Sequence, residues 1–281
     1  MVDKVALSAS MRANLLSLQK TNSLLDTSQL RLSTGRKVNS ALDDPRSFFT
    51  AQGLTNRATD LGRLLDGMGQ SIQTVKAADD GVTAMTRLME QADSIVTQAK
   101  EHLNSGGAAT DAEIAAMEKD FDTIMGQMEA VLEDANYRGI NLLTDDKLIT
   151  QFNEDNSNTF ELAGADFGTG TDLGITWSTA TSDWTNADLT SFESRATEIS
   201  DALTKLRNFS SSLANGLSII QTREDFTKSL IERLEEGSDK LTLADPNEEG
   251  AKMLALQTRM QLGVNSLSMA AQSQQSVLQM F

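Results

Sequence analysis

The stretch that decides the fold is the C-terminal run DPNEEGAKMLALQTRMQLGVNSLSMAAQSQQSVLQMF, residues 245–281. Asp245 is a good helix N-cap and Pro246 fits the first helical position, so a helix is predicted to begin there. No charged side chain follows Arg259, so this helix lacks an ordinary solvated face and we expect it to be buried among other helices. Its interior residues recur at intervals of three and four, which is one seam of a heptad repeat: Met253, Leu256, Met260, Gly263, Leu267, Ala270, Gln274, Val277 and Phe281.

The N-terminal segment carries a second seam of the same kind. Two amides interrupt it, and a polar residue in a seam costs stability but fixes register and partner. Periodicity alone would favour the core face of an ordinary globular helix, whereas the uncharged C-terminal run shifts the interpretation toward burial between subunits. We therefore predict that the two termini pair as helices. The members of this second seam are Met11, Leu15, Leu18, Asn22, Leu25, Gln29 and Leu32.

Composition narrows the class of protein. Only 5% of the 281 residues are aromatic, so a large globular core is poorly supplied and long helices are favoured. The net charge of −16 argues against nucleic acid and anionic membrane surfaces as partners. The chain has no cysteine, which excludes disulfides and thiol chemistry. The N-terminus lacks an apolar run of signal-peptide length, so we expect any export to proceed without a cleaved Sec signal.

The middle of the chain predicts further long helices. The capping box Thr110-Asp111-Ala112-Glu113 would make Thr110 an N-cap. Asp79-Asp80-Gly81 lies at a three-residue skip in the heptads, which fits either local overwinding or a turn. A short glycine-containing connection predicts that the second and third helices are antiparallel neighbours. Besides the last helix, we expect helices over about 3–33, 45–103, 111–137 and 190–237.

Between these helices lies a segment with strand-like alternation at 149–152 and 159–162, with a third candidate strand at 175–177. It contains both tryptophans, Trp177 and Trp184, and is interpreted as a small, acidic, solvent-facing β excursion. The predicted fold is mainly α: a long antiparallel helical, coiled-coil rod with paired terminal helices and a small β insert in the middle of the chain. Its expected divisions are two halves of a terminal coiled-coil domain, two halves of a helical core domain and the β segment, at 1–42 and 245–281, 43–147 and 188–244, and 148–187.

Enzymatic chemistry has little support in the sequence. The one histidine, His102, lies on a predicted helix beside Leu103 and is interpreted as solvated rather than catalytic. No His pair or HExxH motif is present to hold zinc, and adjacent carboxylates on a helix point in different directions. Asp166 and Asp172 beside 168–170 offer a calcium alternative, but the EF-hand spacing is missing. We predict no enzyme, no cofactor and no metal site.

Four segments carry a resemblance to a known family: RLSTGRKVNSALDDP (31–45), YRGINLL (137–143), LTLADPNEE (241–249) and AAQSQQSVLQMF (270–281). Together they resemble the signatures of the bacterial flagellins, the subunits of the flagellar filament, and the resemblance covers nearly the whole chain. The hinge and signature residues that we single out on this basis are Arg31, Gly35, Asn39, Asp43, Asp44, Pro45, Asp245 and Pro246.

The resemblance implies a terminal helical pair in the inner tube of a filament for swimming motility, with a helical core packed around it. Because 148–187 is too short for large outer domains, the chain resembles a near-minimal flagellin. The resemblance also implies unfolded export through the flagellar type III apparatus to an extracellular, secreted filament. The implied partners are copies of the chain itself, hook-associated junction and cap proteins, an export chaperone and any sister flagellins, with no nucleic acid and no membrane.

The function expected from the sequence is therefore structural assembly. The runner-up is a hook–filament junction protein of the same flagellum, which copy number would separate from a filament subunit. A membrane-active or surface-coating secreted protein is a rival that liposome binding would reveal, and an enzyme is a distant third. The residues predicted to form the subunit interface are Met11, Leu15, Leu18, Asn22, Leu25, Leu32, Leu256, Met260, Leu267, Val277 and Phe281.

Overall fold

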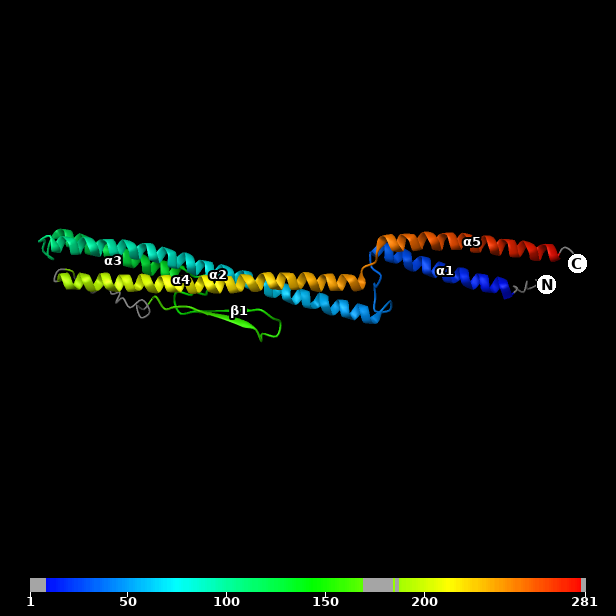
Figure 1. Cartoon of the computed structure of the whole chain (residues 1–281), viewed down its shortest axis with the longest axis horizontal. Coiled ribbons are helices and arrows are strands. Elements are labelled where there is room, and N and C mark those ends of the chain that lie inside the picture. The colour runs from blue at the N-terminus through cyan, green and yellow to red at the C-terminus, as the bar shows by residue number, and fades with distance from the viewer. Residues whose placement is uncertain (1–8, 169–183, 185–186, 279–281) are drawn as a thin grey trace. The chain divides into compact units, whose positions relative to one another are not determined.

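The computed structural model describes residues 9–168, 184 and 187–278 of the chain. Its elements confirm the predicted class, a mainly helical chain with a small β segment in the middle (Figure 1). The part of the predicted first helix that precedes Ala9 lies outside the described residues, as does the candidate strand at 175–177. In chain order, the elements are α1 (Ala9–Thr34), α2 (Pro45–Asn104), α3 (Ala112–Asp134), β1 (Lys147–Gln151), β2 (Thr159–Ala163), α4 (Leu189–Thr242) and α5 (Pro246–Leu278).

The chain divides into two compact units. The first combines Met1–Ala58 with Glu232–Phe281, and the second is Thr59–Ile231. In the first unit, the two terminal helices α1 and α5 pack side by side, as predicted (Figure 1). The unit boundaries fall inside α2 and α4, whereas the five-part division expected from the sequence changes at 42/43 and 244/245. That division remains a proposal.

Two Asp-Pro pairs open α2 and α5 in the same way. Pro45 and Pro246 occupy the first helical positions, where a missing N–H costs nothing. The carboxylates of Asp44 and Asp245 each accept hydrogen bonds from the backbone N–H groups two and three residues later, over 2.8–3.4 Å. The Ser47 hydroxyl also donates to Asp44 (2.7 Å), and this bond lowers the pKa of that carboxyl. Both predicted helix starts are confirmed.

The predicted capping box of α3 is wrong. The helix begins at Ala112, so Asp111 and not Thr110 holds the N-cap position. The Asp111 carboxylate points away from the helix and accepts hydrogen bonds from the Ala108 N–H (2.8 Å) and from His102 Nε2 (2.9 Å). These partners in the α2–α3 connection compete successfully with the helix N–H groups for the same oxygen.

His102 is therefore not the solvated residue that the sequence suggested. Its side chain is 21% exposed and lies between two carboxylates, with Asp111 at 2.9 Å from Nε2 and Glu113 at 3.2 Å from Nδ1. The imidazole ring packs so closely on Gly107 that a Cβ there would collide with it. The ring thus joins the end of α2 to the start of α3. α2 itself is continuous through 79–81, so the alternative of a turn there is wrong.

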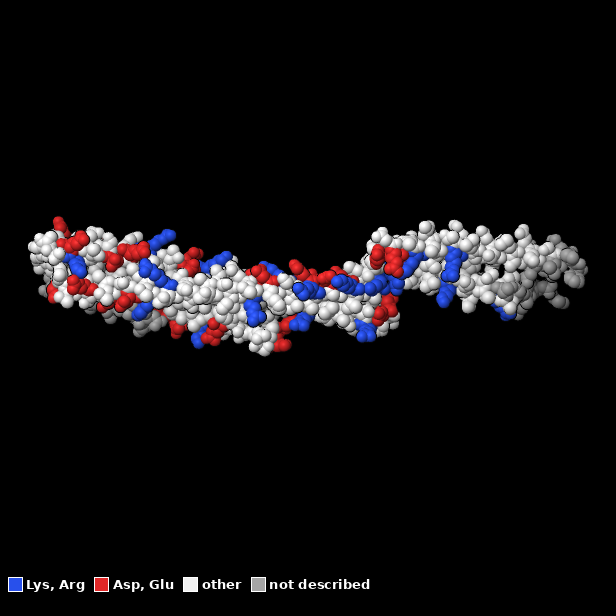
Figure 2. Space-filling model, in the orientation of Figure 1, with Lys and Arg blue, Asp and Glu red and all other residues white. Residues whose placement is uncertain are grey.

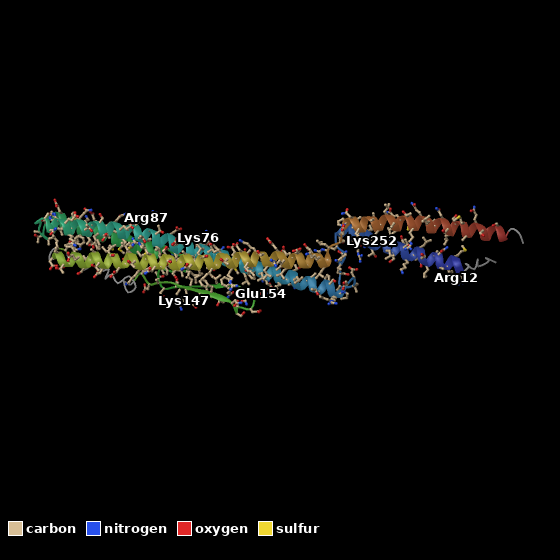
Figure 3. All side chains as sticks on the ribbon, in the orientation of Figure 1. Arg12, Lys76, Arg87, Lys147, Glu154 and Lys252 are labelled. Atoms are coloured by element: carbon tan, nitrogen blue, oxygen red, sulfur yellow. The ribbon has the colours of Figure 1, made fainter. Side chains whose placement is uncertain are left out.

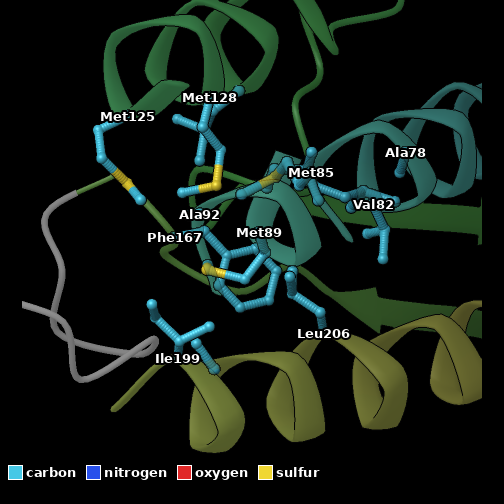
Figure 4. Close-up of a cluster of buried hydrophobic side chains, with 14 of the residues drawn as sticks. Ala78, Val82, Met85, Met89, Ala92, Met125, Met128, Phe167, Ile199 and Leu206 are labelled. Carbon is cyan, nitrogen blue, oxygen red and sulfur yellow. The ribbon is translucent and has the colours of Figure 1, made fainter. Parts of the chain in front are cut away.

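The core of the second unit is built from small and flexible side chains of α2, α3 and α4. Alanine lets helix backbones approach closely, while methionine adapts to irregular gaps (Figure 4). This composition explains how a chain with few aromatic residues closes an interior. The labelled residues in Figure 4 are Ala78, Val82, Met85, Met89 and Ala92 from α2, Met125 and Met128 from α3, Phe167 from the connection after β2, and Ile199 and Leu206 from α4.

The β segment is a two-stranded antiparallel hairpin in which Leu148 pairs with Leu162. The predicted strands are confirmed, but the description of the segment as solvent-facing is corrected. Leu148, Thr150 and Leu162 are buried on its inner face. A Cβ on Gly216 of α4 would lie 3.1 Å from the Leu162 side chain, so the hairpin lies directly on that helix. Because side chains along a strand alternate between two faces, the polar residues identified only the exposed face of the hairpin. The other face packs into the core.

Trp184 is also part of the interior. Its side chain is fully buried, with the ring 5.4 Å from Phe121 of α3 and 4.9 Å from Phe192 of α4, centroid to centroid. The Arg195 guanidinium lies over the same ring at 5.7 Å. The segment after β2 therefore contributes an aromatic anchor between two helices. Trp177 lies outside the described residues.

Candidate assembly surface

The α5 seam is the one predicted from its heptads. Over 251–271, six residues are half-buried and all the others are exposed. Their partner is α1 of the same chain. The Gln274 and Val277 side chains, and all of Phe281, lie outside what the structure describes. The six half-buried residues are Met253, Leu256, Met260, Gly263, Leu267 and Ala270.

The α1 face agrees with the prediction at its apolar positions. Met11 is buried and Leu18 and Leu25 are half-buried, as expected for residues that contact α5. Leu15 and Leu32 are 42% and 38% exposed, however, and lie at the edge of the pair. The pair therefore uses a narrower apolar stripe than the sequence suggested.

The expectation that Asn22 and Gln29 interrupt the seam is corrected. Both amides are exposed, and the hydroxyl residues one position earlier, Thr21 and Ser28, are buried instead. Thr21 Oγ1 donates to the carbonyl one turn earlier (2.9 Å), and Ser28 Oγ donates to Glu249 Oε2 (2.6 Å). Short hydroxyl side chains satisfy their hydrogen bonds within a close helix pair, while longer amides are better accommodated in water.

A carboxylate lies at the hinge end of this pair. Glu249 is only 4% exposed, and besides the Ser28 hydrogen bond its other oxygen lies 3.5 Å from Arg31 Nη1 and 3.2 Å from Lys252 Nζ. Lys252 also pairs with Glu248 at 2.7 Å. Two cations and one hydroxyl from both helices therefore converge on a single buried carboxylate. Such convergence offsets the cost of removing its charge from water.

This environment lowers the pKa of Glu249. The hydrogen bond from Ser28 is the main cause, Lys252 and Arg31 act in the same direction, and burial opposes them. The lowered pKa keeps Glu249 ionised at neutral pH. The ionised form is the one that accepts both the hydroxyl and the cations.

Gly263 provides close contact further along the pair. A Cβ on this glycine would lie 2.6 Å from Leu18 Cδ2, which is closer than carbon atoms can approach. A glycine in a helix interior costs about 1 kcal/mol relative to alanine, so its presence needs a compensating contact. Here it forms a notch in α5 that receives the Leu18 side chain.

The side of α5 opposite the seam is also apolar. Leu254, Leu262 and Met269 are 66%, 63% and 65% exposed, and their spacings of eight and seven residues place them on one helical face. On α1, Leu16 and Leu30 are exposed and fourteen residues apart, so they too share a face. A helix with apolar residues on two faces has room for two neighbours, and the single chain supplies one.

Charged groups are sparse on this pair. Figure 2 shows the surface over α1 and α5 mostly free of them, apart from a cluster at the start of α5, whereas both signs are interspersed over α2 and α4. Arg12 on α1 and Lys252 on α5 are labelled in Figure 3. Exposed leucines on a weakly charged surface are typical of an interaction surface.

The residues predicted to form the subunit interface thus fall into distinct environments. Leu256, Met260 and Leu267 lie in the seam within one chain, together with Met11, Leu18 and Leu25. Leu15, Asn22 and Leu32 are exposed and open to a neighbour. That the whole set contacts other subunits remains a proposal.

The two linkers beside the pair bind each other. Gly35 ends α1 in a left-handed conformation (φ +68°), which suits glycine. Its carbonyl accepts the Ala244 N–H (2.9 Å), and the Lys37 N–H donates to the Thr242 carbonyl (2.8 Å). Lys37 Nζ donates to the Lys240 carbonyl near the end of α4 (2.8 Å). The predicted hinges are therefore joined by backbone hydrogen bonds.

The signature residues of the first linker form a closed turn. Asp43 Oδ2 accepts the N–H groups of Asn39 and Ser40, each at 2.9 Å. These two backbone donors lower the pKa of Asp43. The Asn39 amide donates to Thr34 Oγ1 (3.0 Å), which ties the turn to the end of α1. The motif thus shapes the chain path between the two helices.

Sequence reasoning missed Glu249 and Ser28. The signal was present, because extending the α5 ladder one step back from Met253 reaches Glu249.

Over the described ranges there is no group of three or more His, Asp or Glu side chains arranged to hold a metal ion. Among the helices in the described part of the chain, none is long and apolar enough to cross a membrane.

The fold and this surface define a class of protein. The chain is a helical subunit whose termini form a weakly charged pair, with apolar residues both inside the pair and on its outer faces. Its described residues offer interaction surface rather than a constellation of reactive groups. This combination is that of a self-assembling structural protein.

Comparison with known proteins gives the family. The bacterial flagellin N-terminal helical region matches residues 5–147, and the bacterial flagellin C-terminal helical region matches residues 196–281. Flagellin FljK of Caulobacter vibrioides is 31% identical over 275 residues, which cover 94% of this chain and 93% of that protein. A flagellin of Brucella melitensis is 28% identical over 275 residues and 94% of each chain. The chain belongs to the bacterial flagellin family.

The length of the match fits a flagellin of minimal size, without a large middle domain. Among solved structures, the crystal structure of Bacillus cereus flagellin matches with a TM-score of 0.47 and 13% identity, over 56% of this chain and 86% of that one.

Proposed function

We propose that the chain polymerises with copies of itself through the outer faces of the α1/α5 pair to form the bacterial flagellar filament. Family membership makes it a structural subunit of that filament, which serves swimming motility. The observation that carries the proposed interface is the row of exposed apolar residues opposite the α5 seam, at Leu254, Leu262 and Met269. A single chain leaves this row in water.

The physical reason for assembly is that apolar side chains exposed on one chain gain free energy when another chain covers them. Covering an apolar side chain of this size contributes about 1.5–3 kcal/mol, so a repeated row on every subunit supplies a substantial driving force. The rows differ between α1 and α5, so two subunits meet through unlike faces. Unlike faces give open helical polymers when the rotation between subunits does not close a ring.

The remaining expectations from the sequence belong to this proposal. The subunit is exported unfolded through the flagellar type III apparatus, with a chaperone, and is incorporated into a filament outside the cell. Hook-associated junction and cap proteins, and any sister flagellins, are its further partners. Family resemblance supports these partners, and no catalytic role is included because the family is a structural one.

The test is seeded polymerisation followed by sedimentation and negative-stain microscopy. We expect Leu262→Lys monomers to keep their helical content but to form no filaments, because lysine cannot be buried unpaired in a subunit contact. Asn208→Lys is the matched control: it places the same charge on an exposed position of α4 and is expected to assemble. Normal filaments from Leu262→Lys would remove this face from the interface.

The junction protein of the same flagellum is not favoured, because the named relatives are flagellins. If the chain were a junction protein, the wild-type chain would stay monomeric with every filament seed. A chain that elongates seeds without limit is a filament subunit.

A further inference from the structure

The apolar residues of the α1/α5 pair do not by themselves fix how the two helices are aligned. On α1, Met11, Leu18 and Leu25 are seven residues apart, and α5 repeats with the same period. Sliding one helix along the other by seven residues in one direction therefore places Met11 opposite Gly263 and Leu18 opposite Leu256, so apolar residues still meet. Seams of this kind need a polar residue or a shape feature to exclude shifted alignments.

The native alignment is defined by two contacts. Leu18 enters the notch at Gly263, and Ser28 donates to Glu249 at 2.6 Å. Because the helices are antiparallel, Leu25 and Leu256 lie one heptad inward from the Leu18–Gly263 contact on their respective helices. Both of these leucines are half-buried, as this alignment requires.

A shift by one heptad in either direction separates Glu249 from its α1 partners, Ser28 and Arg31, whereas Lys252 on α5 moves with it. In one direction Leu18 would face Leu256, Thr21 would take the place of Ser28 and Leu24 would take the place of Arg31, so the carboxylate would lose its α1 cation. In the other direction Glu249 would face position 39, beyond the last residue of α1, Thr34. A buried carboxylate that loses a paired cation is unfavourable, whereas leucine tolerates either alignment.

We propose that Glu249 is the register-determining residue of the terminal pair, acting through Ser28 and Arg31. This inference rests on the proposed function, because correct register places the exposed rows of α1 and α5 where neighbouring subunits can bind them. Glu249 is thus a positioning residue for assembly. It need not touch another subunit.

The linkers provide a competing explanation that the experiment must separate. Backbone pairing between Arg36 and Leu243 also ties α1 to the start of α5. If this pairing alone set the alignment, replacing Glu249 would leave the register unchanged. Glu248 supplies a matched control, because it is adjacent, exposed and also paired with Lys252.

Cysteine cross-linking reads the register directly, because the natural chain has no cysteine. Leu25→Cys with Leu256→Cys reports the native alignment, and Leu18→Cys with Leu256→Cys reports the shifted one. Both are oxidised in assembled filaments, and intrachain products are identified by their mobility. With Glu249 present, we expect the native product to exceed the shifted product at least about tenfold, given the cost of separating a buried carboxylate from its paired cation.

Glu249→Leu is expected to raise the shifted product until the two yields are similar. Glu249→Gln can accept the Ser28 hydrogen bond but cannot pair with Arg31, and Thr21 offers it a hydroxyl in the shifted alignment, so it should restore only part of the native preference. Glu248→Leu should leave the wild-type ratio unchanged. A wild-type ratio in Glu249→Leu would overturn the inference and assign register to the linkers, as would a shift of equal size in Glu248→Leu.

Should Glu249→Leu not assemble alone, it is mixed at low proportion into seeded wild-type chains. Its exclusion, with incorporation of Glu249→Gln and Glu248→Leu, supports the inference, while its incorporation with only the native cross-link overturns it. Failure of the wild-type chain to form filaments would instead count against the proposed function. The two failures are therefore distinguishable.

Discussion

The interior of the second unit and the α1/α5 pair solve different problems with similar residues. In the second unit, Met68, Met85 and Met89 of α2 are completely buried by elements of the same chain. In the pair, the α5 seam is half-buried, while Leu254 and Leu262 on the opposite side face water. The apolar side chains of the first region are buried completely within one chain. We propose that the apolar side chains of the second region are buried completely only when other subunits cover them.

The largest effect is expected from a charge in the closed interior. Met89→Lys places an unpaired ammonium group at a site with no exposure, and should destabilise the second unit by more than about 4 kcal/mol. Circular dichroism and thermal unfolding of the monomer measure this loss. The same substitution at exposed Leu262 should leave the monomer's unfolding almost unchanged. Equal destabilisation at both positions would erase the contrast between the two regions.

A charge in the half-buried seam should act between these extremes. Leu267→Lys is expected to separate α1 from α5 and abolish filament formation, while the second unit unfolds at its normal temperature. The physical reason is that Leu267 contributes to pairing within the chain, before any subunit contact. Sedimentation measures assembly and differential scanning calorimetry measures the unit. A lower melting temperature for the second unit would mean that the pair supports that core directly.

Acid should weaken the pair through Glu249. Because its pKa is lowered from the ordinary value of 4.5, its ionised form stabilises the paired state. This stabilisation is fully present above 4.5 and is lost as the pH falls through the lowered pKa. The amount of filament, measured by sedimentation, should therefore fall with acid more steeply in the wild type than in Glu249→Gln.

Comparing the wild type with Glu249→Gln removes the effect of the other carboxylates that titrate in acid. Asp43 and Asp44 also have lowered pKa values, so both chains lose stability from those groups in acid. Only the difference between the two profiles reports Glu249. Identical profiles would contradict its contribution.

The smallest effect concerns the hairpin. Thr150 is buried, and its hydroxyl has no hydrogen-bond partner among the described residues. Thr150→Val keeps the shape, removes a costly polar group and favours a strand, so the second unit should gain about 0.5–1 kcal/mol. Chemical denaturation of the monomer measures this gain, and filament assembly should be unchanged. A loss of stability would show that the hydroxyl is satisfied in solution.

Helix starts followed closely from local sequence, whereas the predicted end of α4 at Gly237 is wrong because the helix continues to Thr242. Asp44-Pro45 and Asp245-Pro246 specify helix starts through their own side chains and their own backbone, so their neighbours hardly matter. The start of α3 did not follow, because Asp111 binds His102 and Ala108 instead of its own helix. A capping residue is predictable only when no other partner reaches it.

The candidate surface was predictable in part. The α5 seam was correct because its 3-4 spacing continues over six half-buried positions. On α1, the choice between the amide Gln29 and the neighbouring hydroxyl Ser28 could not be made from spacing. It depends on Glu249, which lies 221 positions away in the chain and reaches Ser28 only in the folded pair.

The sequence by itself determined the helical class, the matched helix starts, the heptad seam of α5 and the family. These properties depend on local backbone preferences and on periodicity, which neighbouring residues encode. The tertiary structure alone decided that Ser28 and not Gln29 faces α5, that Trp184 is buried and that Glu249 receives partners from both terminal helices. Each of these depends on the distance and hydrogen-bonding capacity of residues remote in the chain, and periodicity carries no information about either.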